Sequence, residues 1–187
     1  RMKAVGKMPR LSNMLGVLSR TNSESLLGSV ARRKSPVIEA GTDFTEGVAI
    51  TSSFFPEPHT HVEPVRYGRG SNFMGLLGTL LTDEEAGVPR WKTWAKEIAK
   101  EPVRAASSLN VRGWSQRSVI ALVMQTLDNS VTVSSGKGLF GRWKMTSRQG
   151  EGEPNPSWIP AGNKAVRILS EKIDGHPFGT MGDIIDA

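Results

Sequence analysis

The segment from Ser118 to Leu127 (SVIALVMQTL) constrains the fold most, because no other part of the chain is as strand-like. It is a continuous apolar run with a high content of β-branched residues, as strands are. Asp128-Asn129 predicts a turn, and Ser130 to Ser134 alternates as a second strand. A glycine turn over Gly136 to Gly141 then leads into a third strand, Arg142 to Ser147. Together these segments predict an antiparallel meander.

A second group of strands is expected earlier in the chain. Gly47 to Phe55 is apolar and β-prone and is followed closely by two prolines, and Thr60 to Tyr67 is the next candidate. The two predict a hairpin-like pair, in which Pro64 indicates an edge position or a bulge. Residues 28 to 46 predict a loop around a short strand at Val37-Ile38.

Helical periodicity separates these strands without a regular alternation of strand and helix. Such an order favours the α+β class, here an antiparallel sheet with helices packed on one face. The predicted helices are Leu11 to Ser19, Phe73 to Leu81, Arg90 to Lys100, Pro102 to Leu109, Ala161 to Ile173 and a short one within residues 176 to 187.

Composition excludes several classes of protein. The absence of cysteine excludes disulfides and thiolate metal sites. No apolar run reaches 18 residues, so no transmembrane helix is expected. The basic N-terminus RMKAVGKMPR lacks an apolar core and a cleavage site, so it is not a signal peptide, and we expect a cytoplasmic or membrane-peripheral protein.

The net charge of +6 leaves one alternative open, a non-catalytic basic module that associates with nucleic acid. The basic residues are scattered and not interleaved with aromatic residues, which favours a solvated basic surface and no nucleic-acid partner. The chain starts Arg-Met and ends in Asp-Ile-Ile-Asp-Ala, which predicts a piece of a longer polypeptide.

The stretch from His59 to Asn72 (HTHVEPVRYGRGSN) holds the densest group of reactive side chains. On a strand, His59, His61 and Glu63 share one face and could chelate a metal. No fourth ligand is evident, so no metal is predicted. A partly desolvated Glu63 suits general-base work, but the residues alone favour a surface glutamate paired with Arg66.

Two other motifs have ordinary explanations. Gly136 to Gly141 matches G-x-G-x-x-G, but a strand follows it and no acidic residue lies about 20 positions on, so we reject it as a dinucleotide loop. Thr21 and Glu24 have the spacing of a capping box. Asn22 between them is by default a turn or cap residue.

Five segments together resemble the glucose–methanol–choline flavin oxidoreductases, particularly their cholesterol-oxidase-type branch. The order of the motifs is preserved along essentially the whole chain. The segments are RTNSE (Arg20 to Glu24), HVEPVRYGRGSN (His61 to Asn72), VIALVMQTLDNS (Val119 to Ser130), GLFGRW (Gly138 to Trp143) and NPSWIPAGN (Asn155 to Asn163).

The resemblance implies an interior, substrate-domain segment of a longer FAD enzyme. Residues 1–20 would be the tail of the FAD-binding domain with a connecting helix, residues 21–175 the substrate-binding domain, and residues 176–187 a linker returning to the FAD-binding domain. The fold would be incomplete without that domain, because the first FAD loop and the later segment with the catalytic histidine and asparagine are not among these motifs. The chain alone is therefore expected to be inactive.

The family oxidises a steroid 3-hydroxyl by hydride transfer to FAD, and a glutamate of the substrate domain then serves as the base for isomerisation. The resemblance places Glu63 on that glutamate's strand and Asn22 near the flavin. It also implies an apolar pocket lined by the strands around Val48 to Phe55 and Val119 to Leu127. Arg66 and Tyr67 depart from the family pattern, which leaves the isomerase activity and the sterol preference open.

Overall fold

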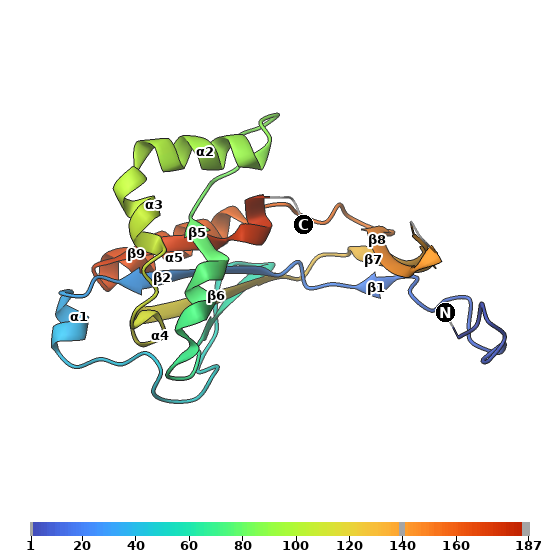
Figure 1. Ribbon diagram of the computed structural model, residues 1–187, viewed down its shortest axis with the longest axis horizontal. Helices are drawn as coiled ribbons and strands as arrows, with labels where there is room; N and C mark the ends of the chain where they lie inside the picture. Colours follow the sequence, from blue (N-terminus) through green and yellow to red (C-terminus); the bar gives the residue numbers. More distant parts are fainter. Residues whose placement is uncertain (1, 139–140, 185–187) are drawn as a thin grey trace. The chain divides into compact units, whose positions relative to one another are not determined.

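The computed structural model describes residues 2–138 and 141–184 (Figure 1). The chain divides into two compact units. The larger unit consists of Glu24–Gln125 and Ser157–Ala187, and the smaller unit consists of Arg1–Ser23 and Thr126–Pro156.

The larger unit is built on a six-stranded sheet in which every neighbouring pair is antiparallel. The strand order is β3-β4-β6-β2-β9-β5. In chain order the strands are β2 (Ser25–Ala31), β3 (Phe54–Glu57), β4 (Thr60–Val65), β5 (Gly78–Leu80), β6 (Ser118–Gln125) and β9 (Gly175–Thr180).

Helix α5 (Pro160–Lys172) packs on one face of this sheet and encloses the core with it. The contact is close because Gly162 lies where any Cβ would come within 2.8 Å of a Val123 methyl group. Farther along α5, the hydroxyl of Ser170 donates to that of Ser29 on β2. The core cluster comprises Leu27, Val62, Leu81, Ala121, Val123, Ile159 and Val166.

Shorter helices complete the larger unit. Trp114, at the start of α4, packs its ring against Phe178 of β9 with the centroids 5.9 Å apart. The elements are α1 (Pro36–Glu39), η1 (Ser71–Leu77), α2 (Arg90–Lys100), α3 (Pro102–Ser108), α4 (Trp114–Arg117) and η3 (Met181–Ile184). None of the helices in the described ranges is both long and apolar enough to cross a membrane.

The smaller unit holds a three-stranded antiparallel sheet of order β1-β7-β8. Its strands are β1 (Ser19–Arg20), β7 (Ser130–Lys137) and β8 (Trp143–Gln149). Lys137 pairs with Trp143, so β7 and β8 form the predicted hairpin. Two residues of the predicted glycine turn, 139 and 140, lie outside the described residues, as do residue 1 and the end of the predicted C-terminal helix at 185–187.

Antiparallel sheets combined with helices confirm the α+β class. The helices predicted at Arg90 to Lys100, Pro102 to Leu109 and Ala161 to Ile173 are present as α2, α3 and α5. The predicted division at residues 20 and 175 refers to a flavin domain and stays a prediction. In the structure, β9 pairs with β2 and β5 inside the six-stranded sheet.

The predicted meander is wrong in one respect, since β6 does not pair with β7. It lies between β4 and β2 in the larger sheet, where no residue along it is exposed. A strand that is apolar throughout can bury both faces only with neighbours on both sides and cover from other elements. Strand β7 becomes exposed toward its turn, and β8 is exposed at every residue after Trp143, so these strands need no such cover.

Other local predictions are also corrected. Residues 11–18 form turns and bends instead of a helix, and Val37-Ile38 belong to α1 instead of a strand. The helix predicted from Phe73 is the 3-10 helix η1 followed by β5. No helix follows Thr21-Glu24, because β2 begins at Ser25, so the capping-box interpretation is wrong.

Strands β2 and β9 were not predicted, because their glycines and proline resemble loop signals. The structure gives these glycines a packing role. A Cβ on Gly28 would lie 2.6 Å from the Phe178 ring, and one on Gly175 would lie 2.7 Å from the Val30 carbonyl oxygen. Glycine in these strands therefore permits close approach between neighbours, which is a recognised use of strand glycine.

Candidate functional site

The face of the six-stranded sheet opposite α5, here called the open face, carries the predicted catalytic glutamate. Side chains alternate between the two faces along a strand, and Val62 of β4 belongs to the core beneath α5. Its neighbours His61 and Glu63 therefore point to the open face. Directly opposite residues of paired strands share a face, so Leu122 of β6, which pairs with Glu63, lies there too.

Glu63 sits in a half-buried position among apolar side chains. Its side chain is 25% exposed. Leu122 lies opposite it on β6, and Leu26 of β2 lies opposite Leu122 in turn. Both leucines are half-buried, so they form an apolar stripe that ends at the Glu63 carboxylate. An apolar ligand lying on these leucines would meet one charged acceptor at its end.

His61 is the nearest titratable neighbour of Glu63. Its Nε2 lies 3.9 Å from Glu63 Oε1, and its ring is 5.6 Å from the ring of Phe55 on β3. This arrangement holds a carboxylate beside an imidazole on an apolar wall. It is the kind of site at which a carboxylate can take a proton from a bound apolar molecule.

The expected pairing of Glu63 with Arg66 is not found. The Arg66 guanidinium donates instead to the backbone carbonyl of Glu46. Within residues 2–138 and 141–184, no salt bridge joins Arg66 to Glu63. The interpretation of Glu63 as a surface glutamate paired with Arg66 is therefore wrong, although Arg66 itself departs from the family pattern.

The proposed lining strand around Val48 to Phe55 is shorter than predicted. Regular pairing begins at Phe54, and Ile50 makes only an isolated bridge to Val65. Phe54 and Phe55 are both exposed. On β6, Leu122 and Met124 lie opposite Glu63 and His61 on the open face, and the pocket lining expected from this strand stays a prediction.

His59 does not join the His61–Glu63 pair on β4. It lies in the turn before β4, which begins at Thr60, and it is exposed. The part of the chain that the structure describes contains no group of three or more histidine, aspartate or glutamate side chains able to hold a metal ion.

Asn22 lies in the smaller unit, in the irregular segment between β1 and β2, and it is exposed. The Ser23 backbone amide donates to Thr21 Oγ1 at 3.0 Å, and Asn129 Nδ2 donates to Ser23 Oγ at 2.5 Å. These contacts fix the backbone on both sides of Asn22, and Ser23 takes a left-handed φ of 46°. Asn22 and Glu63 belong to different units.

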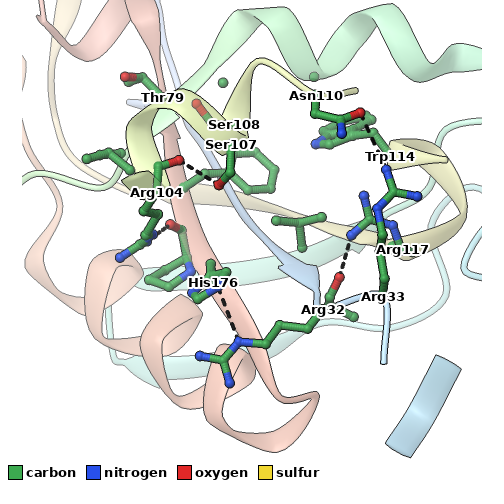
Figure 2. Close-up of a pocket in the computed structure, with 17 residues that line it drawn as sticks. Arg32, Arg33, Thr79, Arg104, Ser107, Ser108, Asn110, Trp114, Arg117 and His176 are labelled. Atoms are coloured by element: carbon green, nitrogen blue, oxygen red, sulfur yellow. Dashed lines mark hydrogen bonds between the residues drawn. The ribbon is translucent and has the colours of Figure 1, made fainter. Parts of the chain in front are cut away.

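One feature of the larger unit was not predicted from the sequence. Four arginines and a histidine from distant segments line one pocket, called here the arginine pocket (Figure 2). Its members are Arg32, Arg33, Arg104, Arg117 and His176. Only the adjacent pair Arg32-Arg33 gave any signal in the sequence, as part of a short basic cluster.

Comparison with known proteins finds curated relatives along the whole chain. Over 191 residues the chain is 49% identical to a protein named cholesterol oxidase in Mycobacterium tuberculosis, in strains CDC 1551 / Oshkosh and ATCC 25618 / H37Rv. It is 32% identical over 186 residues to a protein of that name in Acinetobacter baumannii.

These alignments cover 99 to 100% of this chain and 32% of each relative, so the chain spans about a third of the length of the curated relatives it matches. No protein-family model and no solved structure matches the chain. The cholesterol-oxidase-type resemblance inferred from the motifs is confirmed by these relatives. Along its whole length, this chain is a homologue of proteins named cholesterol oxidase.

Proposed function

We propose that this chain is the substrate-facing part of an FAD-dependent oxidoreductase that oxidises an alcohol, most specifically a sterol 3-hydroxyl. The observation that carries the proposal is the 49% identity, over the entire chain, to proteins named cholesterol oxidase. The apolar stripe of Leu26 and Leu122 supports it, because a sterol is almost wholly apolar and needs such a surface to leave water.

The residues of this chain do not fit the pyrophosphate of FAD. A dinucleotide loop needs a helix N-terminus behind its glycines, whereas the Gly136 to Gly141 motif leads into strand β8. FAD would therefore be held by another part of the same polypeptide, which is the partner domain of this chain. When bound, FAD supplies the hydride acceptor for the alcohol carbon.

We assign Glu63 the role of base in an isomerisation that follows oxidation. A ketone acidifies the neighbouring C–H group, and a carboxylate beside it can take that proton and return it farther along the conjugated system, which moves the double bond. Burial among Leu122 and its neighbours favours this use, since water competes less for the carboxylate.

The remaining assignments concern the surroundings of this reaction. Asn22 is proposed to lie near the flavin, where its exposed side chain is available for a hydrogen bond. A cytoplasmic or membrane-surface location would bring the enzyme to a sterol substrate. Isolated from the flavin domain, the chain would be inactive.

The test uses the full-length polypeptide that contains this chain, mixed with cholesterol without oxygen. The flavin absorbance is expected to bleach, and mass spectrometry is expected to find a 3-ketosteroid. Cholestane, which lacks the 3-hydroxyl, is the control and should leave the flavin oxidised. A flavin that stays oxidised with both cholesterol and simple alcohols would overturn the proposal.

A further inference from the structure

The arginine pocket encloses about 190 Å³ within the larger unit. Its walls come from the end of β2, from β5, from α3 and α4, and from β9. Figure 2 shows the arginine and histidine side chains gathered around it. Trp114 and Phe178 add an apolar wall. The pocket therefore combines a strongly basic lining with one aromatic side.

Two of the four arginines form salt bridges with carboxylates, which offset their charge. Arg32 Nη1 lies 2.6 Å from Asp174 Oδ1, and Arg104 Nη1 lies 2.9 Å from Glu101 Oε2. Arg104 also donates to the Pro177 carbonyl at 2.6 Å. These pairs hold the pocket wall together and leave little net charge.

The other two arginines have only neutral partners. Arg33 Nη2 and Arg117 Nη2 both donate to the carbonyl oxygen of Arg112, at 2.8 and 3.4 Å. Arg117 also donates to the carbonyls of Ala31 and Gly113, and Arg33 to the side chain of Asn110. Among the residues that the structure describes, neither makes a salt bridge.

Two guanidinium groups on one carbonyl oxygen repel each other. Burial lowers the pKa of Arg117, and the charge of Arg33 lowers it further. The pKa of His176 is lowered in the same way, by burial and then by Arg104 and Arg32, although Glu101 and Asp174 oppose this. The pocket thus carries the charges of Arg33, which is exposed, and of Arg117, which is half-buried, and no salt bridge within the described residues offsets either.

We infer that the arginine pocket binds a phosphate group that carries two negative charges, as inorganic phosphate or as a phosphomonoester. A phosphate monoester carries a charge of about −1.5 to −2 at neutral pH, which matches the charge of Arg33 and Arg117. Arginine is suited to this ligand because its planar fork can donate two parallel hydrogen bonds to phosphate oxygens.

Other ligand classes match the pocket less well. A carboxylate has one charge and would leave one of the two guanidinium groups unbalanced, and a neutral sterol would balance neither. The hydroxyls of Ser107 and Ser108 already donate to helix carbonyls, at 2.8 and 2.7 Å. A hydroxyl has a single hydrogen, whereas a guanidinium group has five N–H donors, so Arg33 and Arg117 keep donors for a ligand beyond the bonds they make to carbonyls and to Asn110. Trp114 offers its apolar ring to the carbon part of a monoester.

Isothermal titration of the full-length protein with inorganic phosphate, against chloride at matched ionic strength, tests the inference. Arg33→Gln should weaken phosphate binding by about tenfold or more, as expected for the loss of a charge-assisted hydrogen bond. Lys34→Gln is the matched control. Lys34 is the next residue in the chain, is exposed, and does not line the pocket. Its replacement by Gln therefore removes the same charge from outside the pocket.

A second arm identifies the source of the phosphate group. Vesicles of phosphatidylcholine with and without phosphatidic acid show whether a lipid monoester is bound, and inorganic phosphate should compete with it. If Arg33→Gln is poorly folded, the midpoint of thermal unfolding of the wild-type protein is measured in phosphate and in chloride. A higher midpoint in phosphate alone shows that the folded protein binds phosphate. Absence of saturable binding in both arms, or equal weakening by Arg33→Gln and Lys34→Gln, would overturn the inference.

Discussion

At the scale of single residues, Glu63 stands out because it is a charged group at the end of an apolar stripe. Its position follows from the alternation of β4, which sends Val62 into the core and Glu63 to the open face. Its shared face with His61 was predicted from spacing, and the 3.9 Å separation of the two side chains agrees with it. Its apolar neighbour Leu122 depends on the strand pairing, which the sequence does not reveal.

Glu63→Gln in the full-length protein tests the proposed role of this side chain. Gln keeps the shape but cannot act as a base, so isomerisation should slow by about 10²-fold or more. Oxidation should continue, and the 3-ketosteroid with its double bond unmoved should accumulate. Chromatography of the steroid products distinguishes the two compounds.

The matched control is Glu57→Gln, which removes the same charge from an exposed position on β3. Its product mixture should equal that of the wild-type protein. Unchanged isomerisation in Glu63→Gln, or equal losses in both variants, would exclude Glu63 as the base.

The arginine pocket could not be predicted from the sequence. Arg33 and Arg117 are 84 positions apart in the sequence, and they meet only because β2 pairs with β6. Charge composition therefore indicates that basic residues are numerous but not that four of them line one pocket. Basic residues that are far apart in the sequence can therefore lie close together in the folded chain.

At the scale of elements, prediction succeeded where the periodicity was long and strong. Helix α2 was predicted at its observed limits, Arg90–Lys100, and α5 within one residue at each end. Strand β4 begins at the predicted Thr60 and ends at Val65, two residues before the predicted end, and it lies between β3 and β6 instead of at an edge. These segments carry their pattern in consecutive residues and need no distant partner to define them.

Prediction failed where tertiary packing outweighs the local signal. Strands β2 and β9 contain Gly28, Gly175 and Pro177, which indicate loops, but these residues serve contacts between strands. The pairing of β6 was also hidden, since a continuous apolar run fits several sheet arrangements equally well.

Gly162→Ala tests the packing of α5 on the sheet. The added Cβ would lie 2.8 and 3.0 Å from the two methyl groups of Val123 and 3.1 Å from Leu27 Cδ1. Valine is stiff and this one is fully buried, so overpacking should exceed the gain in helix propensity. The free energy of unfolding should fall by about 1–2 kcal/mol.

Urea unfolding of the chain, followed by tryptophan fluorescence, measures this change. Gly68→Ala is the control, because its added Cβ meets nothing within 4 Å, and its free energy of unfolding should stay within about 0.5 kcal/mol of the wild type. A Gly162→Ala variant that is as stable as Gly68→Ala would contradict the close contact of α5 with β6.

At the scale of the whole molecule, the chain forms two units and spans about a third of its curated relatives. The fold class and the relationship were both predicted from the sequence, the first from periodicity and the second from motif order. The division into units was not predicted, because the chain passes from β6 into β7 without a linker-like composition. Only the pairing partners distinguish the two sheets.

The central claim is that this chain supplies the substrate-facing part of a sterol-oxidising flavoenzyme. A chimaera tests it most directly, in which this chain replaces the aligned 191 residues of the Mycobacterium tuberculosis protein named cholesterol oxidase. The chimaera should hold stoichiometric FAD and oxidise cholesterol at a rate within about tenfold of the parent protein, a difference of about 1.4 kcal/mol in the barrier. A chimaera that is folded and fully loaded with flavin, yet does not oxidise cholesterol, would contradict the claim.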